Sequence, residues 1–178
     1  MNYSKDMKSL DQYHGPVDEQ LNIRNILSTV NDPEVPVLSV MDLGIIRDIK
    51  LNDDEVEVTI TPTYSGCPAM DVISINIRLA LIAHGYKNPK IKQVLSPAWT
   101  TDWMSEEGKQ KLKEYGIAPP NARQQVCHQE LFTPDEAVQC PHCNSYHTHR
   151  VSEFGSTACK SLYQCDDCKE PFDYFKCH

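Results

Sequence analysis

Two cysteine motifs, CPHC at 140–143 and CDDC at 165–168, decide how the end of this sequence folds. They are separated by 21 residues, 144–164, which is close to the spacing of four-thiolate zinc sites. Two residues between thiols allow one tight turn to direct both sulfurs at one ion, and two such turns complete a tetrahedron. A segment this short rarely stabilises itself by burial alone, whereas metal binding can contribute roughly 10 to 16 kcal/mol. We therefore predict a structural zinc site held by Cys140, Cys143, Cys165 and Cys168.

The residues around these motifs favour a small β ribbon. Three segments have the Val, Phe, Leu and Tyr content of short strands: 148–154, 159–163 and 170–175. Asn144 and Lys169 follow the two motifs at positions where Gly often eases the backbone; Asn tolerates that geometry, whereas Lys169 is a mild mismatch. The spacing alone leaves a redox dithiol or an iron-bearing site as alternatives. Because four thiolates complete the site, a surface role is favoured for three nearby histidines: His142, His147 and His149.

Other thiols lie outside this four-ligand set. Cys159, Cys177 and His178 are either buried packing residues or a second, more labile metal site near the chain end. The sequence assigns no role to Cys127. Eight cysteines without a secretory signal point to metal binding or thiol chemistry, because a reducing cytosol seldom tolerates structural disulfides.

Length and composition indicate one ordinary domain with a small appendage. The chain has 178 residues, of which 40% are hydrophobic, as in soluble globular proteins. We divide it into a leader at 1–14, a larger domain at 15–120, a linker at 121–136 and the ribbon at 137–178. Charged residues within 1–11 leave no room for the apolar core of a secretory signal, and no stretch reaches the roughly 18 apolar residues of a membrane span. We therefore expect a cytoplasmic protein without a membrane role.

The charge balance bears on the partners of the protein. Its net charge of -8 works against nonspecific attraction to phosphate backbones, which depends on clustered Lys and Arg. We therefore expect protein partners rather than nucleic acid.

The larger domain has the pattern of a compact α+β fold. Residues 17–30 show helical spacing, and segments 45–51 and 55–61 alternate like two strands joined by a turn. A helix at 69–84, a strand at 90–95 and a surface helix at 105–115 follow, giving the order helix, hairpin, helix, strand, helix. Because apolar residues surround most of 69–84, we predict that the sheet covers this helix on one side and another helix covers it on the other.

Cys67 lies in the sequence Gly66-Cys67-Pro68, directly ahead of the predicted central helix, so its side chain should take the cap position. Free helical amides and the positive end of the dipole favour a thiolate there, so the pKa of Cys67 should fall below that of a free cysteine. Such a thiol suits a nucleophile or a metal ligand. The alternative is a small cysteine that only packs or caps.

Two acids, Asp32 and Glu34, lie on a loop stiffened by two prolines. Rigid acids can bind metals, but acids are also common at turns and helix ends, and the sequence favours that structural role. Trp99 and Trp103 lie four residues apart in a polar segment, where core packing is favoured over contact with a partner.

Three motifs of the larger domain coincide with a known family: DPEVP at 32–36, DLGII at 42–46, and the stretch 63–68 that ends in GCP. In this order and spacing they resemble the SufT-like iron-sulfur assembly domain over residues 17–120. The two cysteine motifs, together with SEFGSTACK at 152–160 and FDYFKCH at 172–178, resemble the PaaD family of accessory subunits of phenylacetyl-CoA oxygenases. The resemblance spans nearly the whole chain.

This resemblance implies an accessory protein that is not itself an enzyme and that works with the oxygenase and reductase subunits. In agreement, the sequence has no paired Glu-x-x-His motifs for a di-iron centre and no glycine-rich dinucleotide fingerprint. The family further implies that Cys67 ligates or transfers an iron-sulfur cluster toward the reductase, with Asp32 and Glu34 nearby. Zinc and a transient iron-sulfur cluster are then the expected cofactors, and the resemblance leaves a homodimer open.

Three alternatives compete with this role. In a scaffolding subunit, the ribbon and Trp99 or Trp103 would bind the oxygenase while Cys67 only packs. A nucleic-acid-binding ribbon is disfavoured because acidic residues outnumber basic ones in 140–178. A dithiol oxidoreductase using Cys165 and Cys168 is disfavoured because that motif does not open a helix after a strand.

Overall fold

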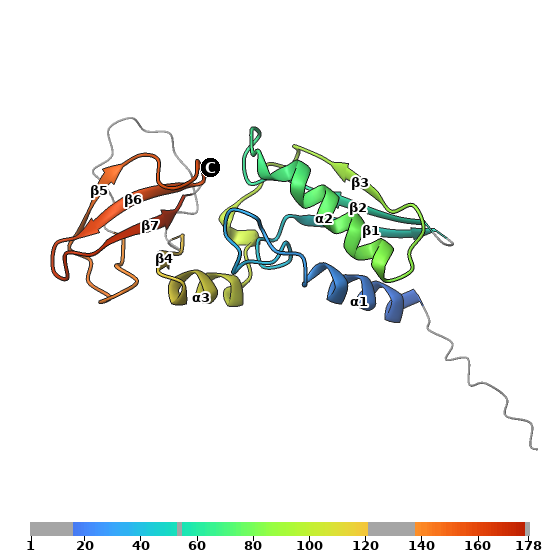
Figure 1. Ribbon diagram of the computed structural model, residues 1–178, viewed down its shortest axis with the longest axis horizontal. Helices are drawn as coiled ribbons and strands as arrows, with labels where there is room; N and C mark the ends of the chain where they lie inside the picture. The colour runs from blue at the N-terminus through green and yellow to red at the C-terminus, as the bar shows by residue number, and fades with distance from the viewer. Residues whose placement is uncertain (1–15, 53–54, 121–137, 177–178) are drawn as a thin grey trace, which may run out of the picture.

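The computed structural model describes residues 16–52, 55–120 and 138–176 of the chain (Figure 1). Within these residues the strands form two sheets, which lie side by side along the long axis of the molecule (Figure 1). The first has the order β1-β2-β3 and the second the order β4-β7-β6-β5. The predicted α+β domain with a small β ribbon is therefore confirmed. In these described residues, no helix has both the length and the apolar character needed to cross a membrane.

The first sheet contains β1 (Ile46–Asn52), β2 (Glu55–Ile60) and β3 (Lys90–Gln93). β1 and β2 are antiparallel, whereas β3 runs parallel to β2 after the crossover through helix α2 (Ala69–Ala83). Val56, Val58 and Ile60 are fully buried, because alternate residues of a strand face the same side. The two predicted strands are thus confirmed as an antiparallel pair.

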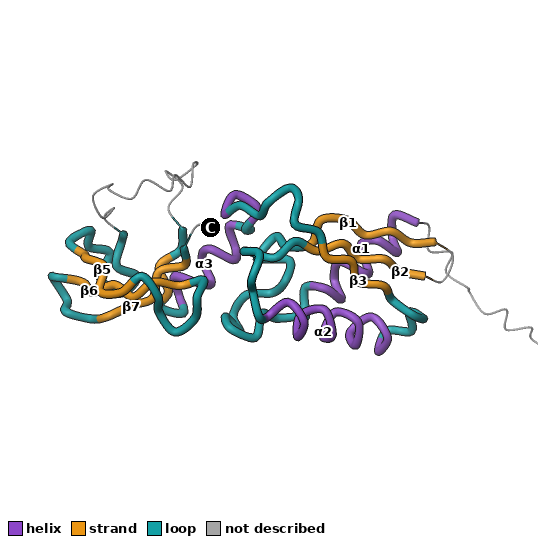
Figure 2. Tube along the Cα trace, turned by 90° about the horizontal axis from the view of Figure 1, so that it is seen from above, coloured by secondary structure: helices purple, strands orange, loops and turns teal. Residues whose placement is uncertain are grey.

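Helix α1 (Pro16–Leu27) contributes Ile23, Ile26 and Leu27 to the core. Helix α2 lies along one face of the sheet and contributes Ile73 and Ile77 to the same core (Figures 1 and 2). The alternation of β2 and the helical spacing of α1 and α2 therefore converge on one buried cluster, as the sequence pattern predicts.

Helix α2 is not enclosed in the way the sequence predicts. Its inner face is buried, but four apolar side chains on its outer face are between 45% and 58% exposed: Val72, Ile75, Leu79 and Ile82. The prediction that a second helix covers this side is wrong, because these four side chains remain exposed although α1 contacts α2. The structure therefore has an uncovered apolar stripe here.

The surface helix α3 (Glu106–Glu114) begins and ends as its sequence predicts. The Ser105 hydroxyl accepts a hydrogen bond from the Gly108 amide at 2.9 Å, and Gly116 follows the helix with a φ of 89°. An ion pair of 2.6 Å joins Lys111 of α3 to Asp42. The short 3-10 helix η1 (Thr101–Trp103) precedes α3, and Arg47 lies over the Trp103 ring at 3.5 Å.

The turn that contains Asp42 requires glycine at position 44. Gly44 has a φ of +66°, and an added Cβ would lie 1.9 Å from the Trp103 carbonyl oxygen. Only glycine fits so close an approach of two backbones. The turn therefore packs directly against η1.

The second sheet forms the ribbon: β4 (Ile117–Ala118), β5 (Thr148–Ser152), β6 (Lys160–Cys165) and β7 (Pro171–Phe175). The three strands predicted within residues 148–175 are confirmed. β4 was not predicted; it follows α3 and pairs in parallel with β7, so the ribbon sheet takes in residues from the end of the predicted larger domain. The division into domains stays a prediction.

The ribbon packs directly onto the larger domain. Phe175 and Cys159 belong to the core of that domain, whereas Tyr163 and Phe172 belong to a separate core within the ribbon. The ring of Phe175 meets that of Trp99 edge-on, with a centroid distance of 6.3 Å. Trp99 is 2% exposed and donates to the Leu43 carbonyl at 2.9 Å, so core packing describes it, as the sequence favoured.

Candidate metal and cluster sites

The four predicted thiols of the ribbon converge on one point. The sulfurs of Cys143 and Cys165 lie 3.5 Å apart, those of Cys140 and Cys168 lie 3.8 Å apart, and all four lie within 4.8 Å of one another. A regular tetrahedron with metal–sulfur bonds of about 2.3 Å places its sulfurs about 3.8 Å apart. The residues present therefore fit a single tetrahedral ion.

Both motifs use the same turn to aim their sulfurs. The Cys140 carbonyl accepts from the Asn144 amide at 2.9 Å, and the Cys165 carbonyl accepts from the Lys169 amide at 3.0 Å. Asn144 and Lys169 have φ values of 62° and 67°, in the left-handed region. The mismatch predicted for Lys169 is therefore real, because a long side chain occupies a conformation that favours glycine.

The thiols of the cage ionise unequally. Burial raises the pKa of Cys140. Against the Glu170 amide, burial and the neighbouring cage sulfurs raise the pKa of Cys168 to about 12. Hydrogen bonds from the amides of Cys168 and Asp167 lower the pKa of Cys165 to about 7. Cys165 is therefore the cage thiol that ionises most readily, and metal ligands must lose their protons. Two nearby histidines contact aspartates rather than the cage sulfurs. The Nδ1 of His147 lies 3.3 Å from an Asp167 carboxylate oxygen, and the Nδ1 of His149 lies 3.1 Å from an Asp166 carboxylate oxygen.

Cys67 lies at the start of α2, but Pro68 rather than Cys67 takes the N-cap position. The thiol is half-buried, and burial is the largest influence on it. Burial raises the pKa of Cys67, the Ala69 amide lowers it less, and the carboxylates of Glu34 and Asp32 raise it further. The prediction that the pKa of Cys67 lies below that of a free cysteine is therefore wrong, because desolvation and acidic neighbours outweigh the helix amide.

Asp32 shapes the loop that carries Glu34. Its Oδ1 accepts hydrogen bonds from the amides of Glu34 at 2.7 Å and Val35 at 2.8 Å. The Asp32 amide in turn donates to the Leu38 carbonyl at 2.8 Å. Burial raises the pKa of Asp32, although these amides and the charge of Lys160 oppose the rise. One carboxylate oxygen of Asp32 thus serves the turn, as the structural interpretation of this acid requires.

Glu34 reaches a thiol from the far end of the chain. The Cys159 thiol donates to the Glu34 Oε2 at 3.6 Å, and the Thr157 hydroxyl lies 3.0 Å from the same sulfur. Tyr64 lies beside this group: burial is the main cause that raises its pKa to about 12, and Cys67, Glu34 and Cys159 add to it. Two thiols, a carboxylate and a phenol from three segments of the chain therefore gather at the junction of ribbon and larger domain.

Sequence reasoning placed some of these residues but not all. It singled out Cys67, Asp32 and Glu34, which the structure brings together, and it grouped Cys159 with Cys177 and His178. The last two residues, like Cys127, lie outside the described part of the chain, so a labile site that includes them stays a prediction. Tyr64 was missed, although it lies within the quoted stretch 63–68.

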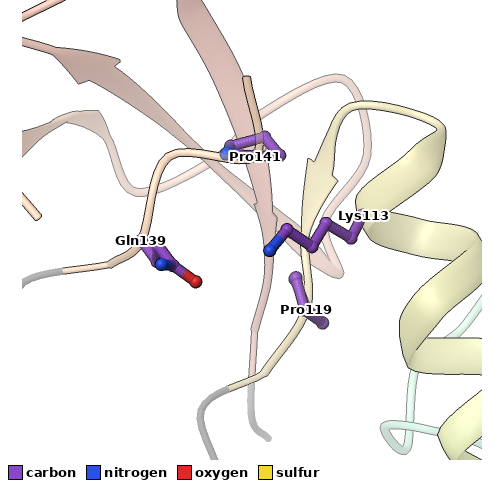
Figure 3. A pocket seen from close by; sticks show the side chains of 4 residues that line it. All are labelled: Lys113, Pro119, Gln139 and Pro141. Carbon is purple, nitrogen blue, oxygen red and sulfur yellow. The ribbon is translucent and has the colours of Figure 1, made fainter. Parts of the chain in front are cut away.

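A small pocket of about 40 Å³ lies beside the ribbon cage. Lys113 of α3 reaches toward Gln139 and Pro141 of the ribbon, and Pro119 completes the lining (Figure 3). Pockets that bind small molecules usually measure roughly 300 Å³ or more. This pocket is therefore a seam between α3 and the ribbon, too small for a coenzyme A thioester.

Comparisons with known proteins find relatives of both parts of the chain. A family model described as "Iron-sulfur cluster assembly protein" matches residues 20–85, and one described as "PaaD zinc beta ribbon domain" matches residues 124–176. The chain is 41% identical over 93 residues to the "Fe-S protein maturation auxiliary factor" of Porphyromonas gingivalis, covering 51% of this chain and 88% of that protein. A solved structure of a DUF59 domain from Bacillus anthracis covers 52% of this chain and 89% of its own, with 24% identity and a TM-score of 0.49.

One relative matches across both parts of the chain. It is an Escherichia coli (strain K12) protein named as one of the subunits of a "Putative 1,2-phenylacetyl-CoA epoxidase", and it is 49% identical over 152 residues. The match covers 85% of this chain and 89% of that protein, and so includes residues of both the assembly domain and the ribbon. The chain therefore belongs to the PaaD family, which includes this epoxidase subunit.

Proposed function

We propose that this chain is a non-catalytic accessory protein that assembles or delivers an iron-sulfur cluster to the reductase component of a phenylacetyl-CoA epoxidase. The observation that carries the proposal is the position of Cys67: a half-buried thiol at the start of α2, beside the carboxylate of Glu34. Relatives named as a maturation auxiliary factor and as an epoxidase subunit support the role and the partner. We expect it to act in the cytoplasm, without nucleic acid.

The chemistry of delivery suits a thiol of this kind. Iron-sulfur clusters are held by cysteine thiolates, so Cys67 must lose its proton when it binds iron. A raised pKa keeps the empty Cys67 protonated and thus protects it from oxidation. Transfer is a ligand exchange in which a cysteine of the recipient replaces Cys67 on the iron and Cys67 regains a proton. No electrons move in this step.

We further propose that the ribbon cage holds zinc in a structural role. Four thiolates fill the tetrahedron and leave no open coordination position for a reacting group. Burial alone would leave a ribbon of this size marginal, so the ion supplies stability to the sheet β4-β7-β6-β5.

A cellular assay tests delivery. Reductase is produced with the wild-type chain or with Cys67→Ser as the only copy, and iron and sulfide are counted on the purified reductase. We expect Cys67→Ser to leave the reductase depleted of cluster, because serine is a poor ligand for the iron of a cluster. Ser65→Ala, an exposed substitution in the same loop, is the matched control and should leave the reductase loaded. Full loading by Cys67→Ser would overturn the proposal.

A scaffolding role in the epoxidase complex is the second candidate, and the outer face of α2 favours it. Apolar stripes left open to water often mark protein interaction sites, and this one holds Ile75 and Leu79 at 57% and 58% exposure. If scaffolding is the whole function, Cys67→Ser leaves the reductase loaded, while Ile75→Lys with Leu79→Lys abolishes co-purification of the epoxidase subunits.

A further inference from the structure

Cys159 is a ribbon residue whose thiol is buried in the larger domain. It is 5% exposed and packs in the same core as Phe175 and Val35. Its sulfur lies 3.6 Å from the Glu34 carboxylate, although the two residues are 125 positions apart in the sequence. The proposed zinc cage does not use this thiol, and the SEFGSTACK motif that contains it has no part in the proposed delivery by Cys67.

The motif around Cys159 fixes the position of its sulfur. The Ser156 hydroxyl donates to Asp173 of β7 at 2.9 Å, and the Lys176 amide donates to the Cys159 carbonyl at 3.0 Å. Gly155 packs so closely that an added Cβ would lie 2.5 Å from an Asp173 oxygen. The loop is thus tied to β7 at several points, which holds a thiol better than a free loop does.

The charges around Cys159 face the loop that carries Glu34. Lys160 is 5% exposed, lies 3.8 Å from Asp173, and lowers the pKa of Asp32 by its charge. The ribbon therefore presents a thiol to Glu34 and a buried cation toward Asp32. Both contacts join the ribbon to the same acidic loop that borders Cys67.

We propose that Cys159 is the second thiolate ligand of the cluster site begun by Cys67, with Glu34 as a neighbouring oxygen ligand. The inference rests on the proposed function and deepens it, because the ribbon then completes the site that binds the cargo. A single cysteine is a weak anchor for a cluster, whereas clusters are commonly held by several thiolates. Binding through two thiolates releases two protons, and delivery returns them, with no change in the number of electrons.

Cys67, Cys159 and Glu34 do not form a compact cage for a single ion. In the described part of the chain, the four cage thiols are the one group of three or more potential ligands whose atoms all lie within 4.8 Å. Cys67, Cys159 and Glu34 are therefore more widely spaced than a tetrahedral cage. A cluster contains more than one iron and so spans a wider gap than a single ion does.

Reconstitution of the full chain tests the inference. Wild type, Cys67→Ser, Cys159→Ser and the control Ser65→Ala, an exposed substitution, are loaded without oxygen using ferrous iron and sulfide. Iron, sulfide and zinc are counted per chain, and the rate at which an iron chelator removes the cluster is followed by visible absorption. We expect Cys159→Ser to keep its zinc but lose the cluster at least about tenfold faster than wild type, since even outer ligand partners affect metal affinity by about 10- to 100-fold.

The outcomes separate the two proposals. A wild-type loss rate in Cys159→Ser, with rapid loss in Cys67→Ser, would overturn the role of Cys159 and leave delivery by Cys67 intact. Failure of the wild-type chain to bind iron would overturn both.

Loss of zinc from Cys159→Ser would show that the ribbon of this variant has not folded. The inference is then tested by cross-linking the wild-type chain. Dibromobimane, a short reagent that joins two nearby thiols, should link Cys67 to Cys159 in the zinc-loaded protein. The link should disappear once iron and sulfide are bound. Its absence from the cluster-free protein, as seen by peptide mass spectrometry, would overturn the inference.

Discussion

The carboxylate of Glu34 acts on two thiols, those of Cys67 and Cys159. It contributes to the raised pKa of Cys67, and its charge helps to bring the pKa of Cys159 to about 11, with burial the larger cause in both. A nearby negative charge disfavours a thiolate, so removing it must lower both pKa values. At a fixed pH below those values, more of each thiol is then ionised.

We therefore expect Glu34→Gln to speed the alkylation of Cys67 by iodoacetamide between pH 7 and pH 9. The gain should be less than about tenfold, the change produced by one pKa unit, because burial persists. Mass spectrometry of the peptide containing Cys67 gives the rate. Glu106→Gln, an exposed acid on α3, should leave the rate unchanged. An equal or slower rate in Glu34→Gln would show that Glu34 does not act on this thiol.

Lys169 carries avoidable backbone strain in the ribbon. A non-glycine residue in the left-handed region destabilises the fold by roughly 1 to 2 kcal/mol. Glycine removes this strain, but its greater freedom in the unfolded chain cancels part of the gain in stability. Lys169→Gly should therefore stabilise the ribbon by about 0.5 to 1 kcal/mol, measured as the urea midpoint of the metal-loaded chain. Lys169→Ala removes the same charge but keeps the strain, so it should give no gain. A gain with Ala as large as with Gly would assign the effect to charge instead.

Helix α3 is tied to the turn at Ser39–Gly44 by one carboxylate. Asp42 accepts from the Ser39 hydroxyl at 2.8 Å and from Lys111 at 2.6 Å. Burial opposes ionisation, but the hydrogen bonds of Lys111 and Ser39 outweigh it and lower the pKa of Asp42. The same turn carries the carbonyl of Leu43 that Trp99 contacts, so α3 and the ribbon interface depend on one loop.

Asp42→Asn should reduce the free energy of unfolding by about 1.5 to 3 kcal/mol at pH 7, the range for hydrogen bonds to a charged group. Because the folded pKa of Asp42 is depressed, its stabilisation is present above the unfolded value of about 3.9 and is lost as pH falls through the folded value. Urea unfolding at pH 7 and pH 3.5 should show the gap between wild type and variant narrowing in acid. Both chains share the same cage, so loss of metal in acid affects them alike. A gap of equal size at both pH values would contradict this account.

Most helices and strands could be predicted from short sequence patterns, because each pattern reflects one physical property of the element, such as a buried face or a capped end. Alternation in 55–61 reports a single buried face, and Ser105 with Gly116 brackets α3 through their hydrogen bonding and φ preferences. Strand β4 was not predicted, because a strand of two residues is too short to show an alternating pattern. The prediction that a helix packs over the outer face of α2 was wrong. A helix with apolar residues on every side indicates that it is buried, but the pattern does not show which element or molecule lies against each face. Here, the outer stripe is open among the described residues.

The site depends on contacts that join distant parts of the chain, which a sequence read locally does not reveal. The motif GCP singles out Cys67 in the sequence, but the raised pKa of Cys67 follows from burial and from acids on another loop. The approach of Cys159 to Glu34 depends on how the ribbon docks, which Phe175 and Trp99 set through their edge-on contact. The convergence of the two CxxC motifs could be predicted because their spacing is typical of four-thiolate sites, although the spacing does not choose the metal.

Removal of the metal should change the structure of the ribbon and the environment of Trp99 in the larger domain. The cage closes the ribbon, and β7 of the ribbon delivers Phe175, which is 2% exposed, to the larger core beside Trp99. Chelation should unfold the ribbon, withdraw Phe175 and admit water to the Trp99 ring, while α1, α2 and β1–β3 retain their own buried cluster.

A chain carrying Trp103→Phe leaves Trp99 as the sole tryptophan reporter. In that chain, a strong zinc chelator should shift Trp99 fluorescence to longer wavelength, while far-ultraviolet circular dichroism keeps most of its helical signal. Restored zinc should reverse the shift. Phe175→Leu, which keeps an apolar contact but removes the ring, should show part of the shift before any chelator is added. Unchanged Trp99 emission after complete metal removal would mean that the ribbon keeps its fold and its position without the ion, and that burial of Phe175 alone holds Cys159 against Glu34.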